Sequence, residues 1–106
     1  TAIVVMSEFG RTVKENANGG TDHGRGGLML VMGGAVRPFG DAAYQGRMSW
    51  QLPASVDGST PLSLVHDYRL VLAEILERHL AVPTATVRTA FANQLGGSPS
   101  YLNVLL

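Results

Sequence analysis

Two short apolar runs stand out in the first third of the chain, Ala2–Met6 and Leu28–Met32. Both are continuous instead of alternating, and turn-forming residues follow them, Ser7 after the first and Gly33-Gly34 after the second. Runs of this length and composition favour buried β-strands over helices. A buried strand of the parallel type needs neighbours on both sides, and few other strands are evident here. We therefore expect residues 1–106 to be a single C-terminal segment of a larger α/β domain.

Helical periodicity appears only in the second half of the chain. Apolar residues recur at helical spacing over about residues 63–80, and Ser63 is placed to cap the start of that helix. A second helix is predicted over about residues 84–93, with Thr84 as its cap. Between the second apolar run and the first helix, prolines and glycines interrupt every periodic pattern, so no regular element is predicted there.

The segment that joins the two apolar runs is polar and rich in glycine. Ser7–Gly20 ends in turn-forming residues and predicts a loop, which Gly24–Gly27 continues. Ten of the 13 glycines fall within the first 46 residues. Glycine allows backbone conformations and close approaches that other residues disfavour, so the chain has most conformational freedom around Thr21–Gly27.

Composition narrows the class of protein. With 106 residues, 45% of them hydrophobic and 15% charged, the chain is globular and no more than one domain. Its formal net charge of zero argues against a nucleic-acid partner. The absence of cysteine excludes disulfides and thiolate metal sites. No apolar run approaches the length of a membrane span.

Glu8 is the first residue that suggests chemistry. It follows the first predicted strand by two positions, and open α/β sheets bind ligands beyond the carboxyl ends of their strands. A carboxylate in that place suits a metal or, together with Arg11, an anion. The alternative is a surface glutamate that pairs with Arg11 or caps a helix.

The adjacent residues Asp22 and His23 are the second candidates for metal binding. A carboxylate and an imidazole suit zinc, manganese or a similar divalent ion. Neighbouring residues rarely both bind one ion, so Asp22 could instead orient His23. The alternative is a pair that only fixes a turn in a hydrated loop.

Arg11 and Arg25 flank these residues and can hold phosphate or sulfate oxygens with their planar guanidinium groups. Ordinary salt bridges to Glu8, Glu15 or Asp22 are the alternative. Ser7 lacks the sequence context of a nucleophile, so no catalytic residue is assigned.

Several of these segments together resemble the C-terminal part of the domain-of-unknown-function 1501 family. They are Val4-Val5-Met6-Ser7-Glu8-Phe9-Gly10-Arg11-Thr12, Gly20-Thr21-Asp22-His23-Gly24-Arg25-Gly26, Leu30-Val31-Met32-Gly33-Gly34-Ala35-Val36-Arg37 and Asp67-Tyr68-Arg69-Leu70-Val71-Leu72-Ala73-Glu74-Ile75-Leu76. The resemblance implies the α/β sandwich of the alkaline phosphatase and sulfatase superfamily, with metal ligands at strand ends. It implies Glu8 and His23 as ligands, whereas Phe9 stands where the superfamily has a ligating histidine.

The resemblance also implies a twin-arginine export signal and a periplasmic or exported protein. The nucleophile and remaining ligands would lie in an N-terminal part outside these residues, so we expect this segment to be inactive by itself. The leading hypothesis is a hydrolase of small phosphate or sulfate esters that depends on zinc, manganese or calcium. The alternative is a non-catalytic exported binding or assembly protein that keeps the fold. A self-contained small domain is a third possibility.

Overall fold

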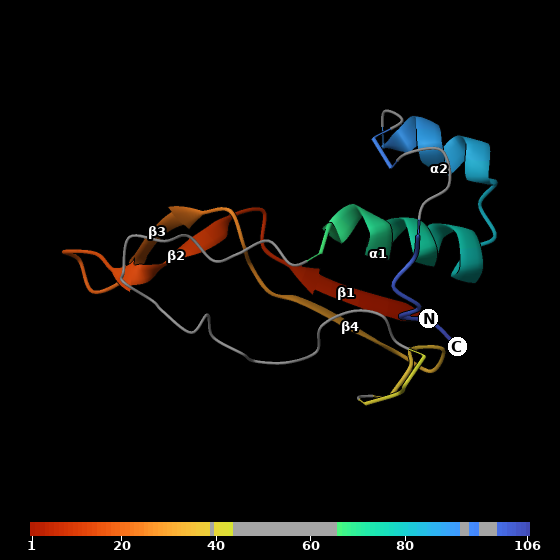
Figure 1. Ribbon diagram of the computed structural model, residues 1–106, viewed down its shortest axis with the longest axis horizontal. Coiled ribbons are helices and arrows are strands. Elements are labelled where there is room, and N and C mark those ends of the chain that lie inside the picture. Colours follow the sequence, from red (N-terminus) through yellow and green to blue (C-terminus); the bar gives the residue numbers. More distant parts are fainter. Residues whose placement is uncertain (39, 44–65, 92–93, 96–99) are drawn as a thin grey trace. The chain divides into compact units, whose positions relative to one another are not determined.

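The computed structural model describes residues 1–38, 40–43, 66–91, 94–95 and 100–106 (Figure 1). Its strands are β1 (Ala2–Met6), β2 (Gly10–Glu15), β3 (Thr21–Gly24) and β4 (Met29–Gly33). Its helical segments are α1 (Tyr68–Glu74), the π-helical turn η1 (Ile75–His79) and α2 (Thr84–Ala90). This mixed content confirms the predicted α/β class.

The chain divides into two compact units. The helical unit comprises residues 1–3, 31–48 and 66–106, and the hairpin unit comprises residues 4–30 and 49–65. None of the helices in the described part of the chain is long and apolar enough to cross a membrane.

Both predicted apolar strands are present, and they pair with each other. β1 covers the predicted residues, β4 begins one residue later than predicted, and the end of β4 lies beside the start of β1 in an antiparallel arrangement. The prediction that the strands are buried is wrong: Ile3, Val5 and Met32 are 52%, 50% and 47% exposed. Among the described strands, β1 and β4 pair only with each other, and the expectation that further neighbours belong to a larger domain stays a prediction.

The polar segment between β1 and β4 is a β-hairpin, which corrects the predicted loop. β2 and β3 pair antiparallel, with Gly10 opposite Gly24 and Glu15 opposite Thr21. The turn is closed by Asn16, whose side-chain oxygen accepts hydrogen bonds from the backbone N–H groups of Asn18 at 3.0 Å and Gly20 at 3.1 Å. Local side-chain bonds of this kind and the turn residues around them specify the hairpin despite its low hydrophobicity.

The predicted first helix is confirmed over α1 and η1, but its cap is not Ser63. The carboxylate of Asp67 accepts a hydrogen bond from the Arg69 backbone N–H at 2.9 Å, so the helix begins at Tyr68. The Arg69 side chain also bonds this carboxylate and holds its pKa below the ordinary value of 3.8. Residues 63–65 of the prediction lie outside the described residues.

The predicted second helix is confirmed as α2, from Thr84 to Ala90. Pro83 is the capping residue instead of Thr84, and its fixed φ suits the approach to a helix. Residues 92 and 93 of the prediction lie outside the described part of the chain.

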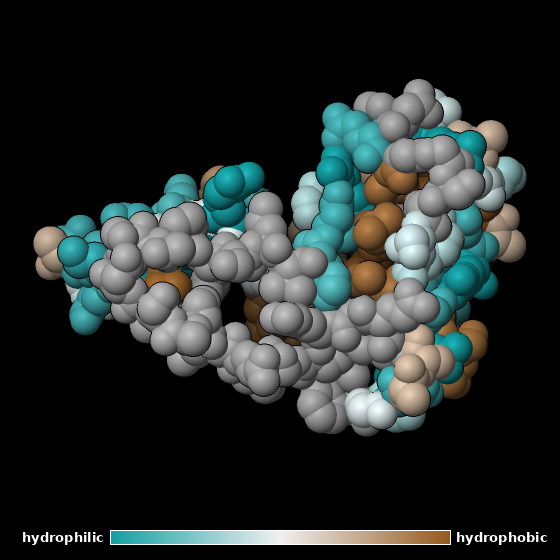
Figure 2. Space-filling view, viewed as in Figure 1, coloured by the Kyte–Doolittle hydropathy of each residue, from teal (hydrophilic) through white to brown (hydrophobic). Residues whose placement is uncertain are grey.

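The core of the helical unit lies between its two helices and the end of the chain. Ala73, Val87 and Leu95 form a buried cluster, and partly buried apolar residues pack around it: Leu70, Leu76, Val82, Phe91 and Tyr101. Figure 2 shows apolar residues gathered among hydrophilic ones in this part of the molecule.

The end of the chain completes the helical unit. Leu102, Val104 and Leu105 are buried, and Leu105 forms an antiparallel bridge with Val36. Backbone hydrogen bonds from Arg37 N to Val104 O and from Leu106 N to Ala35 O extend that pairing on both sides, at 2.9 and 2.8 Å.

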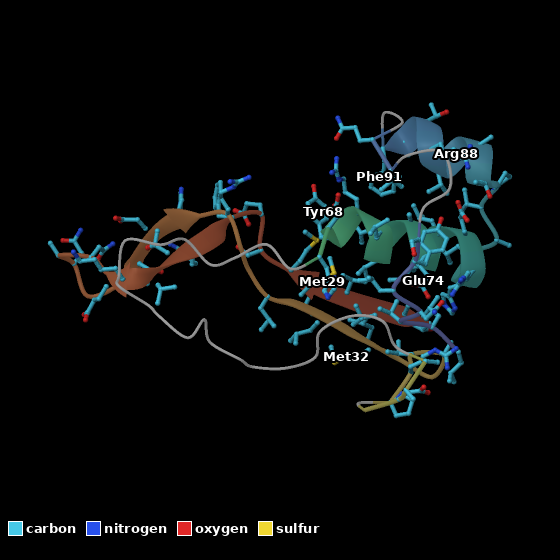
Figure 3. The ribbon with its side chains drawn as sticks, in the orientation of Figure 1. Met29, Met32, Tyr68, Glu74, Arg88 and Phe91 are labelled. Carbon is cyan, nitrogen blue, oxygen red and sulfur yellow. The ribbon has the colours of Figure 1, made fainter. Side chains whose placement is uncertain are left out.

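Within the described part of this unit, one charged residue is fully buried. Glu74 has no exposed surface and faces the final segment of the chain (Figure 3). Its Oε1 atom accepts hydrogen bonds from the Leu105 backbone N–H at 3.1 Å and from the Arg78 guanidinium at 3.0 Å. The carboxylate therefore joins α1 to the chain end, and the Arg78 pair keeps its charge compensated.

Tyr101 lies beneath the same arginine. The Arg78 guanidinium is 5.3 Å from the centre of the Tyr101 ring, and it also donates a hydrogen bond to the Asn103 side chain at 2.9 Å. Burial, with the Glu77 carboxylate beside it, raises the pKa of the Tyr101 phenol to about 12.

Candidate functional site

The residues that the sequence singles out lie on or directly beside the β2–β3 hairpin. Arg11 belongs to β2, Asp22 and His23 belong to β3, and Glu8 and Arg25 lie just outside the strand ends. All five are exposed. The hairpin therefore determines which of these side chains share a face.

Arg11 and His23 are direct partners in the strand register. Side chains opposite each other in an antiparallel pair project from the same face, with Cβ atoms about 5 Å apart. One Arg11 nitrogen donates a hydrogen bond to the Thr21 backbone oxygen at 2.8 Å, which holds the guanidinium against β3, two residues from His23 along that strand. The side chains of Arg11 and His23, a guanidinium and an imidazole, thus lie on one face of the hairpin.

Phe9 completes this arrangement, and its role was not recognised from the sequence. Its ring stacks on the His23 imidazole with centroids 4.2 Å apart and an angle of 11° between the planes. Phe9 remains 46% exposed. Stacking covers one face of the imidazole and leaves the ring nitrogens, which lie at its edge, available. The sequence signal was an aromatic residue two positions before Arg11, within diagonal reach of the opposite strand.

Glu8 directly precedes Phe9 and lies between the end of β1 and the start of β2. The assignment of Glu8 and His23 as metal ligands stays a prediction. In the described part of the chain, no group of three His, Cys, Asp or Glu residues is arranged to hold a metal ion.

Asp22 belongs to the other face of the hairpin, because successive strand residues point in opposite directions. Its Oδ1 accepts a hydrogen bond from the Asn16 side chain at 2.9 Å. It lines a shallow polar pocket of about 350 Å³ together with Thr12, Lys14, Glu15, Asn16 and Ala17. The structure does not bring the Asp22 carboxylate and the His23 imidazole to one point, and the metal role of Asp22 also stays a prediction.

Neither Arg11 nor Arg25 forms a salt bridge within the described residues, where Arg37, Arg69 and Arg78 do. The alternative of salt bridges to Glu8, Glu15 or Asp22 is therefore not seen. Exposed guanidinium groups that are not neutralised by carboxylates can attract anions.

Two glycines allow the strands to come together at the base of this face. A Cβ atom on Gly10 would lie 2.5 Å from the Arg25 carbonyl carbon and 2.6 Å from the Gly24 oxygen. A Cβ atom on Gly24 would lie 2.5 Å from the backbone of Arg11. Only glycine fits these positions without moving a strand, so the glycines in the two motifs serve close backbone approach.

The fold and this face define an α/β chain that presents imidazole, guanidinium and carboxylate groups from one exposed hairpin. Residues 1–46 match the model of a family described as "Protein of unknown function (DUF1501)". The match includes β1 to β4 and every predicted site residue, and it supports the family resemblance over these 46 of the 106 residues. No curated protein and no solved structure matches the chain.

Proposed function

We propose that the β2–β3 hairpin forms one wall of a metal-dependent site that hydrolyses a phosphate or sulfate ester. In this proposal the chain is the C-terminal segment of an exported protein similar to alkaline phosphatases and sulfatases. The catalytic nucleophile and the remaining metal ligands come from the N-terminal part of the same protein.

The observation that carries this proposal is the pairing of Arg11 with His23 across the hairpin. An imidazole is a suitable ligand for zinc or manganese, and a guanidinium binds the oxygens of phosphate and sulfate. A metal ion and a guanidinium next to each other can act on the same group of oxygens during hydrolysis of such an ester.

The residues of this chain would have separate tasks. His23 and Glu8 would hold a divalent ion, and that ion would supply Lewis-acid chemistry at the ester. Arg11 binds a non-bridging oxygen and compensates the charge that develops on it. The Arg25 backbone lies beside Gly10, and its side chain would supply a second cation. Phe9 limits rotation of the imidazole by stacking on it.

Metal content measured on the intact protein tests the ligand assignment. The protein is loaded separately with zinc, manganese and calcium, freed of unbound ion and analysed by mass spectrometry of the elements. We expect bound metal in the natural protein and a clear loss in the double variant Glu8→Ala with His23→Ala. His79→Ala is the matched control, since it removes an imidazole from η1 and should leave the metal content unchanged.

Equal metal content in the natural protein and the double variant would refute the ligand assignment. A separate assay identifies the oxyanion: hydrolysis of phosphate monoesters and of sulfate monoesters is measured with the same preparations of the natural protein.

A non-catalytic binding or assembly role is the second candidate, and Phe9 favours it. This residue stands where the resemblance implies a ligating histidine, and its ring packs against the one histidine of the hairpin. That function predicts anion binding without metal and without turnover. Phosphate that binds the intact, metal-free protein and is lost in Arg11→Gln, together with no ester hydrolysis, would support it.

A further inference from the structure

We infer that the anion held beside Arg11 carries a planar ring, which binds on the Phe9–His23 stack. The inference deepens the proposed function, on which it rests for the location of the site. Independent support comes from two features of one hairpin face, an exposed aromatic stack and a guanidinium that has no carboxylate partner among the described residues.

The stack offers an unusual apolar surface. Phe9 and His23 are nearly parallel at 4.2 Å, yet Phe9 is 46% exposed and His23 is also exposed. None of the described side chains in the hairpin unit is buried, so Phe9 has no apolar core to pack into there. A ligand ring placed on this pair would extend the stack and remove apolar surface from water.

Arg11 supplies the second half of the recognition. A guanidinium has five N–H donors, and the described contacts use one Arg11 nitrogen, for the Thr21 oxygen. The remaining donors suit two oxygens of a phosphate or sulfate group. Because Arg11 is the direct cross-strand partner of His23, a single small molecule can reach both the guanidinium and the stack.

Ligand size and charge can be separated from ring chemistry by matched probes. Phenyl phosphate and cyclohexyl phosphate share their charged group and have rings of similar size, but only the phenyl ring is planar and aromatic. Phenyl sulfate and cyclohexyl sulfate form the same comparison for the second oxyanion. The two pairs together show which oxyanion is preferred and whether the ring matters for each.

Binding is measured by NMR titration of the intact protein in the presence of a chelator, with the ring protons of His23 as the reporter. We expect phenyl phosphate to bind about two- to tenfold more tightly than cyclohexyl phosphate, the range expected for one aromatic contact. The ring current of the phenyl group should also shift the His23 ring protons, and the cyclohexyl group should not shift them in this way.

Three variants assign the effect to residues. Phe9→Leu keeps an apolar side chain and should remove the preference for phenyl phosphate, whereas Phe9→Tyr keeps the ring and should retain it. Arg11→Gln should weaken both phosphates by the same factor. Because Phe9 is half exposed, its replacement by leucine leaves no cavity in a core, and circular dichroism confirms that each variant is folded.

Equal affinity for the phenyl and cyclohexyl probes, no binding of either up to millimolar concentration, or a preference that persists in Phe9→Leu would overturn the inference. Its failure is distinct from that of the proposed function. Loss of metal in the Glu8 and His23 double variant without a ring preference contradicts only the inference. A ring preference without metal binding contradicts only the metal-dependent hydrolysis.

Discussion

Replacing Glu74 by alanine should loosen the final segment of the chain from α1. Glu74 is fully buried, and its Oε1 is the acceptor for both the Leu105 backbone N–H and the Arg78 guanidinium. Leu105 is itself only 3% exposed, so its N–H group would lose its partner in a place that water does not reach. The variant therefore removes a charged hydrogen bond and leaves a buried donor unsatisfied.

The expected loss of unfolding free energy follows from these contacts. A hydrogen bond to a charged acceptor contributes roughly 1.5 to 3 kcal/mol. The ion pair with Arg78 adds about 0.3 to 0.5 kcal/mol, because the arginine side chain is 44% exposed and the pair has the i,i+4 spacing of a helix surface. Glu74→Ala should thus cost roughly 2 to 3.5 kcal/mol. Glu74→Gln keeps an acceptor oxygen and should cost about 1 kcal/mol.

Urea denaturation of the intact protein measures the free energy, and hydrogen exchange at the Leu105 amide measures the local contact. Glu74→Gln is the control, since it keeps a side-chain oxygen that can accept the Leu105 N–H. We expect fast exchange at Leu105 in Glu74→Ala and much slower exchange in Glu74→Gln. If Glu74→Gln destabilises the protein as much as Glu74→Ala, or if Leu105 stays protected in Glu74→Ala, the reasoning about the buried bond is refuted.

Three further predictions concern the hairpin, the helix start and the alkaline pH range. Gly10→Ala should cost about 1 to 3 kcal/mol, because its Cβ would press on backbone atoms 2.5 to 2.7 Å away. Gly34→Ala, with nothing within 4 Å, should be nearly neutral in the same urea titration, and equal effects would contradict the clash. Asp67→Ala should lower the unfolding free energy by about 1 kcal/mol through loss of the N-cap, and Asp67→Asn should recover most of it; no recovery would argue against capping. The Tyr101 phenol should ionise near pH 12 by ultraviolet absorbance, and stability should fall as pH rises from 10 to 12, because the folded state retains this proton longer than the unfolded state; titration near 10 would exclude the burial effect.

The regular elements with strong hydrophobic patterns were predictable from the sequence. β1 and β4 follow from continuous apolar runs, and α1 with η1 follows from helical periodicity. The ion pair between Glu74 and Arg78 is the contact that i,i+4 spacing favours. The burial of Glu74 was not predictable, because its cause is the Leu105 N–H, 31 residues further along the chain.

The residues of the candidate site could be predicted from the sequence, but their arrangement on the hairpin could not. The polar segment between β1 and β4 has few apolar residues and therefore predicts a loop, although Asn18-Gly19 carries the local signal of a hairpin turn. Recognising β3 as a strand would have placed Asp22 and His23 on opposite faces at once. The pairing of Arg11 with His23 depends on the register of β2 against β3. That register shifts between Arg11 and Glu15, and the pattern of polar and apolar residues does not reveal the shift.

The pairing of Val36 with Leu105 sets an order for folding during synthesis on the ribosome. The helices of the helical unit can form as soon as their residues emerge, since their hydrogen bonds are local. Leu105 emerges after both helices, so until then the Glu74 carboxylate has no Leu105 N–H to bind, and the backbone of Ala35 and Arg37 has no segment 104–106 to pair with. The unit therefore closes in one late step, and a polypeptide stalled shortly before residue 102 would expose apolar surface to chaperones and proteases.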